Sequence, residues 1–494
     1  MRPVDCFGTR VRSFGNRLAI VDPAGSWTYA QLDADASRLA GALLDGATDL
    51  AEARVALLCT PGRDFVTALL ACWAAGGIAV PVHPGHPHPE QAYVVRQSGA
   101  SLIVSSREYD DDARRLASEV AARSVAVDAA SAPVEPGELD DARRALIIYT
   151  SGTTGAPKGV VHTHSTLRAQ AASLADAWAW SADDRIILVL PLHHVHGLVN
   201  VALCALWSGA VCEAPGNFDA RATWDRLASG DLTLFMAVPT IYTRLITAWT
   251  EAAPFDRERW SAGAAHLRLM VSGSAALAVA TLERWRDITG HVLLERYGMT
   301  ELGMALSNSL TSRVAGKVGF PLPGVHIRIV DDASLDVPDG TAGELLVRGP
   351  NVFLEYWRDP EATASAFVDG WFRTGDVAVR EPEGYRLLGR ASVDIIKSGG
   401  EKVSALEVEE ALRAHPDIAD CAVVGLPDEE WGERVCAAVV LRDGASLDSD
   451  DLRAWAKSRV APAKVPARVL FRRELPRNAL GKVIKPEVVG LFRS

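Results

Sequence analysis

Residues 149–160, "YTSGTTGAPKGV", combine three glycines, five hydroxyl side chains and one lysine in twelve positions. The segment continues an apolar run, "RALIIY", which is typical of a buried strand. Backbone N–H groups, hydroxyls and an ammonium all suit an anion, so the segment predicts a phosphate-binding loop. It is not a Walker loop, because Lys158 stands between Pro157 and Gly159 and not in a G-K-[ST] triplet.

Four further stretches combine flexible and polar residues in ways that suit chemistry. They are "ERYGMTE" (295–301), "WFRTGD" (371–376), "GRASVDIIKSGGEKVSALEVE" (389–409) and "PRNALGKVIKP" (476–486). The first presents an aromatic ring, a hydroxyl and a carboxylate directly after an apolar run. The last places Lys482 after a glycine, in a turn near the C-terminus.

The elements that must position these residues follow an α/β pattern. From about residue 27 to 310, helical stretches alternate with nearly continuous apolar runs, as expected of parallel strands covered on both faces. Short alternating segments over about 316–390 predict a small antiparallel β unit. The remaining chain predicts a separate α+β domain. We therefore expect a large N-terminal domain over 1–390 and a small C-terminal domain over 391–494.

Composition excludes some classes of protein. The net charge of −11 argues against a general nucleic-acid binder, and no long apolar segment predicts a membrane span. The seven cysteines form no C-x-x-C pair and mostly lie in apolar runs, which indicates buried free thiols in a reducing compartment. We expect a cytoplasmic protein, with an organelle matrix as the alternative, and a monomer or weak homodimer.

In their order and separations, the five stretches resemble the adenylate-forming superfamily of acyl-CoA synthetases, luciferases and peptide-synthetase adenylation domains. The resemblance runs from about residue 25 to 488. It implies an acid–thiol ligase that uses ATP, Mg²⁺ and coenzyme A. In this chemistry a carboxylate, itself a poor acyl donor, is joined to AMP, and a thiol then attacks the mixed anhydride.

The resemblance also implies roles in binding ATP. The loop residues that hold the β- and γ-phosphates are Thr150, Ser151, Gly152, Thr153, Thr154, Gly155 and Lys158. Tyr297 stacks on adenine beside Gly298 and Met299, and Thr300 bonds the α-phosphate. Glu301, with Thr154, ligates Mg²⁺. Asp376 accepts the ribose hydroxyls, helped by Arg390, because a carboxylate can take two O–H donors. Without the family, these side chains would indicate a core aromatic, a turn residue and a surface ion pair.

Lys482 is the residue that we expect to drive the first step. A carboxylate that attacks the α-phosphate brings two anions together, and one ammonium between them offsets the repulsion. In the family the C-terminal domain is mobile and rotates after adenylation, and Asp394 matches the position of its hinge. The "KSGGEKV" segment then lines a pantetheine tunnel, so the resemblance implies coenzyme A binding by Ser398, Gly399 and Gly400.

The acid is indicated by "PLHHVHGLVN", "AVPTIYTRL", "LMVSGSAAL" and "LLERYGMTELGMALS", which resemble malonyl-CoA synthetases that also take methylmalonate. The resemblance implies that His194 lies near the reacting carboxylate, and that Met304 borders the C2 substituent. It assigns the distal carboxylate to Arg244, on the helix expected over 237–249, with Ser272 and Ser274. A metal site at the clustered histidines is a weaker alternative, since no further ligands lie nearby. Glu401 departs from the subfamily, which often has tyrosine there.

Three alternatives stay open. They are a ligase for a short-chain or aromatic monocarboxylate, an adenylation enzyme that loads a carrier protein, and a nucleotide-binding regulator without catalysis. Arg244 discriminates against the first, because an unpaired buried charge beside an apolar tail would be costly.

Overall fold

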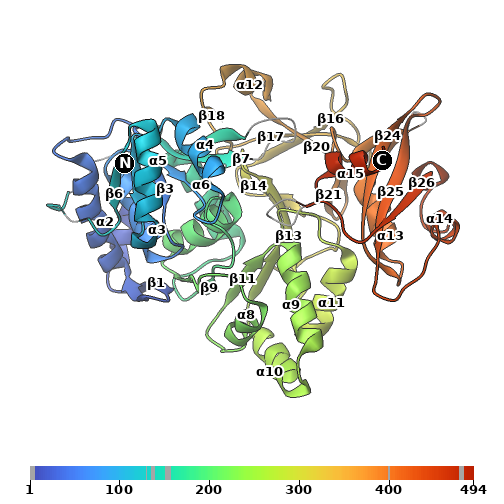
Figure 1. Ribbon diagram of the computed structural model, residues 1–494, viewed down its shortest axis with the longest axis horizontal. Coiled ribbons are helices and arrows are strands. Elements are labelled where there is room, and N and C mark those ends of the chain that lie inside the picture. The colour runs from blue at the N-terminus through green and yellow to red at the C-terminus, as the bar shows by residue number, and fades with distance from the viewer. Residues whose placement is uncertain are drawn as a thin grey trace.

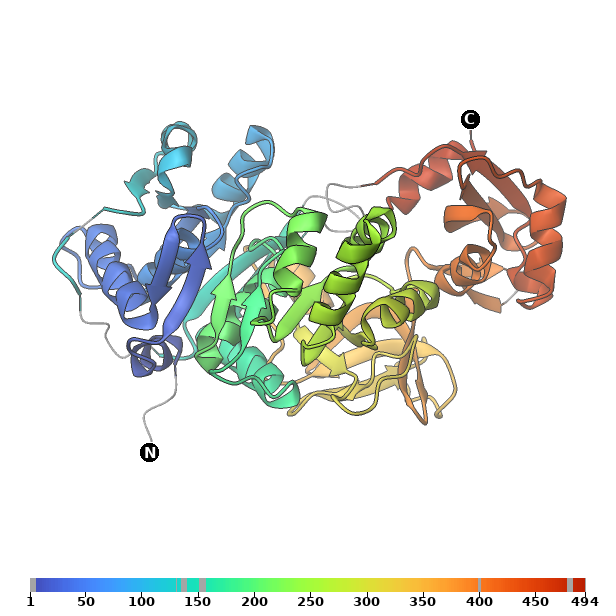
Figure 2. The same cartoon turned by 90° about the horizontal axis from the view of Figure 1, so that it is seen from below.

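The computed structural model describes residues 6–129, 131–134, 140–150, 157–398, 401–477 and 483–493. Figure 1 shows a large N-terminal part at the left and centre and a smaller C-terminal part at the right. Seen from below, the C-terminal part stands beside the rest of the molecule (Figure 2). The expected α/β fold, with a large and a small part, is confirmed.

A seven-stranded sheet carries the predicted phosphate loop. Its order is β18 (Glu355–Tyr356), β8 (Lys158–Thr163), β7 (Arg144–Thr150), β4 (Ile78–Pro81), β3 (Arg54–Leu58), β5 (Leu102–Ser105) and β6 (Arg123–Ala126). Strands from β7 to β6 are parallel, and β4 and β5 are buried along their whole length. Helices in this part are α2 (Tyr29–Leu44), α3 (Arg63–Ala74), α4 (His88–Ser98) and α5 (Asp110–Val120). Burial on both faces explains the continuous apolar runs.

A nine-stranded sheet carries the acyl and nucleotide motifs. Its order is β15 (Phe320–Pro321), β14 (Gly303–Ser307), β13 (Leu294–Met299), β12 (Leu269–Ser272), β11 (Leu234–Ala237), β9 (Arg185–Ile187), β10 (Val211–Glu213), β1 (Leu18–Asp22) and β2 (Gly25–Thr28). The strands from β13 to β1 are parallel. Helices around it include α6 (His164–Ala177), α8 (Ala220–Leu227), α9 (Pro239–Glu251), α10 (Pro254–Ala264) and α11 (Val279–Thr289). Pro239 begins α9, as its sequence predicts.

The small β unit is antiparallel, as predicted. It contains β16 (His326–Val330), β17 (Gly343–Arg348), β19 (Phe367–Val368), β20 (Trp371–Glu381) and β21 (Gly384–Arg390). Two segments of the range 316–390 join the larger sheets instead, because β15 pairs with β14 and β18 pairs with β8. Local alternation predicts a strand but does not determine its partner.

The C-terminal part is built on one five-stranded sheet. Its elements are β22 (Ile395–Ser398), β23 (Glu401–Ser404), α13 (Ala405–Arg413), β24 (Ile418–Asp428), β25 (Gly432–Leu441), α14 (Ser449–Lys457), β26 (Arg468–Arg472) and α15 (Lys485–Leu491). Its buried apolar side chains form their own clusters, from Ile396 onwards. The boundary between residues 390 and 391 stays a prediction.

The cysteines are all free, and all but Cys6 are buried. Among the described residues, no helix combines the length and apolar character that a membrane crossing needs.

Candidate active site

Strands β7 and β8 flank the phosphate loop. They pair antiparallel with Thr150 opposite Lys158, whereas Ser151, Gly152, Thr153, Thr154 and Gly155 lie outside the described residues. The exposed Lys158 has its Nζ 5.0 Å from the centroid of the Tyr356 ring. The hydroxyl of Tyr356 donates a hydrogen bond of 2.9 Å to Glu301 Oε1. The described end of the loop therefore lies beside Glu301.

Glu301 has the surroundings of a cation ligand. It follows β13, only 7% of its surface is exposed, and burial raises the pKa of its carboxyl group. No lysine or arginine of the described chain forms an ion pair with it. Arg390 acts on Glu301 only through its charge, and a buried carboxylate with no ion-pair partner among the described residues fits a hard divalent cation, which takes oxygen ligands. Thr154, the other expected ligand, lies outside the described residues.

Thr300 is positioned by a histidine that the sequence did not single out. His162 is fully buried, and its Nε2 lies 2.8 Å from the carbonyl oxygen of Thr300. Gln170 donates to Nδ1 of this ring, so Nε2 carries the proton and donates to Thr300. Burial lowers the pKa of His162 to about 4, which keeps the ring neutral. The motif "GVVHTH" contains this histidine, but its spacing carries no signal of the contact.

The structure brings Tyr297, Asp376 and Arg390 together from β13, β20 and β21. The Tyr297 hydroxyl donates to Asp376 Oδ2 over 2.5 Å, and Arg390 Nε lies 2.9 Å from Oδ1. Asp376 is 8% exposed and Tyr297 is 7% exposed. The predicted adenine and ribose residues are thus one buried cluster, although their roles stay predictions.

Gly298, Met299 and Met304 shape the hairpin between β13 and β14. A Cβ built on Gly298 would lie 1.9 Å from the carbonyl oxygen of Gly303 and 2.4 Å from Met304 Cε. Only glycine fits there. Met299 Sδ lies 4.0 Å from the Tyr297 hydroxyl oxygen, and Met304 is 3% exposed.

His194 belongs to a group of packed imidazoles. Its ring centroid is 3.9 Å from that of His193, which packs in turn at 4.5 Å against His83 and 5.0 Å against His86. His83 and His86 come from the segment before α4 and were not anticipated from the sequence. Burial lowers the pKa of His194 to about 4, so its ring is neutral. Within the described ranges, no three acidic, histidine or cysteine side chains are arranged to hold a metal ion.

Arg244 is exposed on α9. Its guanidinium Cζ lies 4.6 Å above the Phe218 ring centroid. It is therefore not the buried arginine that would discriminate between dicarboxylates and monocarboxylates, and its role in substrate binding stays a prediction.

The buried arginine is Arg296. It lies on β13, is 4% exposed, and has no ion-pair partner among the described residues. Its Nε and Nη2 also lack hydrogen-bond partners there. Burial lowers the pKa of this guanidinium to about 9, so it remains charged at neutral pH. Arg296 is thus a desolvated cation without a counter-charge in the described part of the chain, a costly arrangement unless a ligand completes it.

Arg296 packs against the serine turn. A Cβ built on Gly273 would lie 2.4 Å from Arg296 Cζ. Ser272 is 1% exposed, and its Oγ has no partner in the described chain. Ser274 Oγ lies 3.1 Å from Nδ1 of the buried His196, whose Nε2 is also unpartnered among the described residues. The turn, His196 and Arg296 therefore bring unsatisfied polar groups together.

Arg296 stands directly before Tyr297 in the motif "ERYGMTE". Residues 296 and 297 point to opposite faces of β13, so one motif serves two sites. The sequence prediction assigned this motif to nucleotide binding through Tyr297 and gave Arg296 no role.

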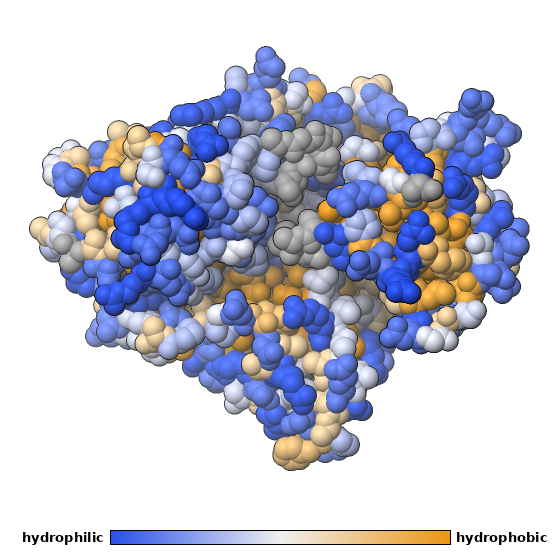
Figure 3. Space-filling model, viewed as in Figure 1, coloured by the Kyte–Doolittle hydropathy of each residue, from blue (hydrophilic) through white to orange (hydrophobic). Residues whose placement is uncertain are grey.

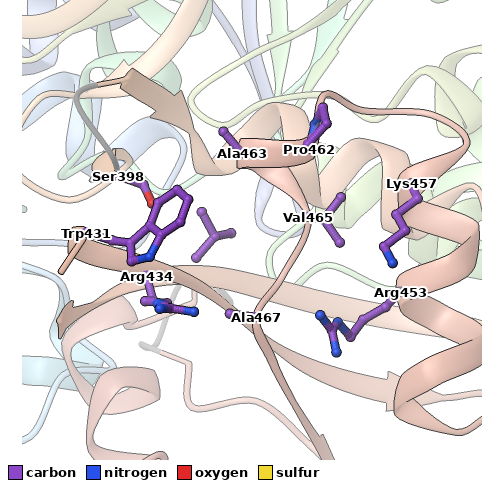
Figure 4. A pocket seen from close by; sticks show the side chains of 10 residues that line it. Ser398, Trp431, Arg434, Arg453, Lys457, Pro462, Ala463, Val465 and Ala467 are labelled. Carbon is purple, nitrogen blue, oxygen red and sulfur yellow. The ribbon is translucent and has the colours of Figure 1, made fainter.

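Ser398 lines a cavity of about 410 Å³ in the C-terminal part, and this cavity was not anticipated. Figure 4 shows Trp431 and Arg434 near Ser398, with Arg453 and Lys457 extending from α14. Gly399, Gly400 and Lys482 lie outside the described residues. Asp394, the predicted hinge, lies between β21 and β22. In the view of Figure 3, the surface is hollowed where the large and small parts meet.

Comparisons with known proteins agree with this arrangement. The family described as "AMP-binding enzyme" matches residues 7–357, and "AMP-binding enzyme C-terminal domain" matches 407–482. The human protein "Malonate--CoA ligase ACSF3, mitochondrial" is 45% identical, over 98% of this chain and 91% of the relative. ATP-bound MatB from Rhodopseudomonas palustris is 33% identical, with a TM-score of 0.89 over 99% of both chains.

A malonyl-CoA ligase in a ternary product complex with methylmalonyl-CoA and AMP is also similar. It is 39% identical, with a TM-score of 0.70, over 94% of this chain and 98% of that one. Family matches over both parts of the chain confirm the resemblance drawn from the motifs. The chain belongs to the AMP-binding, adenylate-forming enzyme family.

Proposed function

We propose that this protein is an AMP-forming acid–thiol ligase that converts malonate to its coenzyme A thioester through an acyl-AMP intermediate. Family membership supports the adenylation chemistry, with ATP, Mg²⁺ and coenzyme A as the required small molecules. The human relative, whose name is that of a malonate–CoA ligase, supports the choice of acid.

The observation that supports a dicarboxylate substrate is Arg296, which is buried and has no ion-pair partner among the described residues. A second carboxylate on the acid would neutralise the guanidinium and could accept two parallel N–H donors from it. Ser272 and His196 would complete the set of donors. A monocarboxylate with an apolar tail would leave the charge unpaired, at a cost of several kcal/mol.

In the first half-reaction, a carboxylate oxygen of malonate forms a bond to the α-phosphorus while the bond to the departing pyrophosphate breaks. His194 lies at the reacting carboxylate, Thr300 donates to the α-phosphate, and Lys482 places its ammonium between the two anions. Glu301 and Thr154 would hold Mg²⁺, which neutralises phosphate charge.

The nucleotide is held by the cluster around Asp376. The ribose hydroxyls donate to the carboxylate of Asp376 while Arg390 stays paired to it. Adenine stacks on Tyr297 beside Gly298 and Met299. The phosphate loop, Thr150 to Lys158, holds the β- and γ-phosphates.

In the second half-reaction, the thiol of coenzyme A attacks the acyl carbon and AMP leaves. Ser398, Gly399 and Gly400 contact the pantetheine arm. The cavity beside Ser398 is lined by Arg434, Arg453 and Lys457, which suits the phosphates at the nucleotide end of coenzyme A. Asp394 is the hinge about which the C-terminal domain turns between the two steps.

Methylmalonate is the second proposed substrate. Met304 is buried within the hairpin that follows Tyr297 and would border the extra methyl group, and methionine adapts to such a change. The protein acts as a monomer or weak homodimer in a reducing compartment, the cytoplasm or an organelle matrix, which its free thiols support.

The test is to incubate the purified protein with ATP, Mg²⁺, coenzyme A and malonate. Malonyl-CoA identified by mass spectrometry, with AMP and pyrophosphate released in equal amounts, is the expected result. Formation of ADP and phosphate, or thioester formation from butyrate but not from malonate, would contradict the proposal.

A further inference from the structure

The carboxylate of Asp394 bonds to both sides of the predicted hinge. Its Oδ2 accepts a hydrogen bond of 3.0 Å from the backbone N–H of Arg390, which ends β21 of the large domain. Its Oδ1 lies 2.6 Å from Nζ of Lys485, which begins α15 of the C-terminal domain. A rotation of the backbone between residues 390 and 394 must therefore strain or break one of these two bonds.

Lys485 is held firmly in the C-terminal domain. It is 9% exposed, and its Nζ also lies 2.9 Å from Glu409 Oε1 on α13. Glu409 is itself fixed by the backbone N–H of Val423 at 2.9 Å and by Arg413 Nη2 at 3.1 Å. Burial by itself would lower the pKa of Lys485, but the two carboxylates raise it, so the ammonium stays charged.

The same lysine lies next to the segment that carries Lys482. Arg477 and Val483, on either side of that segment, pair in an antiparallel bridge, and Arg477 forms an ion pair with Asp420. The described ends of the segment are thus attached to the C-terminal sheet. Lys485, three residues beyond Lys482, attaches one of these ends to the hinge.

On the other side of the hinge, the contacts continue to the nucleotide cluster. Arg390 donates its backbone N–H to Asp394 and pairs through Nε with Asp376 Oδ1 at 2.9 Å. Consecutive polar contacts therefore lead from the predicted ribose site through Asp394 to Lys485.

The overall structure is more similar to an ATP-bound relative than to a product complex. The TM-score is 0.89 for ATP-bound MatB at 33% identity, but 0.70 for the methylmalonyl-CoA and AMP complex at 39% identity. The less similar sequence thus has the more similar structure.

We propose that Lys485 is a positioning residue for adenylation: its ion pair with Asp394 holds the C-terminal domain in the orientation that presents Lys482 to ATP. The inference rests on the proposed two-step function. Lys485 pairs with Asp394 and Glu409, so in this proposal it acts through Asp394 and the segment of Lys482.

The test separates the two half-reactions in Lys485→Met. Adenylation is followed as acid-dependent exchange of pyrophosphate with ATP, and thioester formation as malonyl-CoA made from supplied malonyl adenylate. Exchange is expected to fall about tenfold, and thioester formation to change less than twofold. Lys485→Arg, which keeps the charge, is expected to restore exchange to at least half of the wild-type rate.

Lys317→Met is the matched control. Lys317 lies in the large domain, pairs with Glu381, and has a side chain 11% exposed, the same fraction as Lys485. Both half-reactions of this variant are expected to stay within about twofold of the wild type, since it loses a buried ion pair away from the hinge.

Asp394→Asn removes the same ion pair from the other side and still accepts from the Arg390 N–H. Asp394→Asn should therefore show the same selective loss of pyrophosphate exchange, and it serves as the test if Lys485→Met fails to fold. In the double variant, exchange should be no slower than in the slower of the two single variants. Equal slowing of both half-reactions, unchanged exchange, or multiplied losses in the double variant would overturn the inference. Exchange is measured with malonate and with butyrate. If the proposed acid is wrong, exchange appears with butyrate alone, and the effect of Lys485→Met is then measured with butyrate.

Discussion

The hydroxyl of Tyr297 donates a 2.5 Å hydrogen bond to Asp376, the residue expected to bind ribose. The other oxygen of this carboxylate faces Arg390 Nε at 2.9 Å. Each oxygen of the Asp376 carboxylate thus already faces one protein donor. A ribose hydroxyl competes with the tyrosine for this carboxylate, while the arginine holds the carboxylate in place.

Asp376→Asn is expected to raise KM for ATP about 10- to 100-fold, because an amide oxygen accepts O–H donors more weakly than a carboxylate. Tyr297→Phe keeps the ring for stacking and removes the competing donor, so its KM for ATP should stay within about threefold of the wild type. Steady-state kinetics at saturating malonate and coenzyme A measure both. Equal increases in the two variants would contradict a ribose role for the carboxylate.

Gly298→Ala tests the close packing of the hairpin. The added Cβ would meet the Gly303 carbonyl oxygen at 1.9 Å, and we expect a loss of about 3 kcal/mol in unfolding free energy. Gly490→Ala in α15 meets nothing within 4 Å and should gain about 0.5–1 kcal/mol through helix propensity. Thermal melting distinguishes them; equal melting temperatures would show that the hairpin relaxes freely.

Titration of the Glu295 carboxyl group is expected to make the free energy of unfolding depend on pH. Burial first, and then Glu410, raise the pKa of this carboxyl group from 4.5 to about 7. The folded state therefore binds the proton more tightly, and the associated stability is complete below about pH 4.5 and is lost as the pH rises through about 7.

Glu295→Gln removes this titration and can still accept the Gly316 N–H. Its stability relative to the wild type should rise by roughly 2–3 kcal/mol between pH 5 and pH 8. Melting temperatures of both proteins across this range measure the effect. A constant difference would contradict the raised pKa.

The cavity beside Ser398 predicts a contact with coenzyme A phosphates. Replacing Arg453 and Lys457 together by alanine is expected to raise KM for coenzyme A about tenfold, with KM for ATP unchanged. Dephospho-coenzyme A, which lacks one phosphate, should show a smaller difference between variant and wild type. Arg442→Ala, an exposed arginine of the same domain outside the cavity, is the control. A KM for coenzyme A unaffected by the double substitution would place these phosphates elsewhere.

The sequence predicted the elements better than their connections. The strands β5 and β7 were recognisable because burial on both faces gives a continuous apolar run, and α13 and α14 because burial on one face imposes a helical period. The partners of β15 and β18 were not, because register and pairing depend on residues far along the chain.

Site residues that lie in contiguous motifs could be predicted from the sequence. Site residues that meet only through folding could not. Tyr297, Asp376 and Arg390 followed from three motifs. His162 under Thr300, His83 beside His193, and Lys485 at the hinge are contacts between distant segments that no local spacing reports. Arg244 attracted attention as an arginine on an apolar helix, yet it is exposed, and only three-dimensional packing shows that Arg296 is the desolvated cation.

Arg296 is proposed to select a dicarboxylic acid over a monocarboxylic acid. The most direct measurement compares kcat/KM for malonate and butyrate, by pyrophosphate release, in the wild type, Arg296→Gln and Arg244→Gln. In Arg296→Gln, malonate turnover is expected to fall at least about 100-fold while butyrate turnover is unchanged or improved, which also shows that the variant is folded. An unchanged ratio of malonate to butyrate in Arg296→Gln, or a wild type that prefers butyrate, would contradict it.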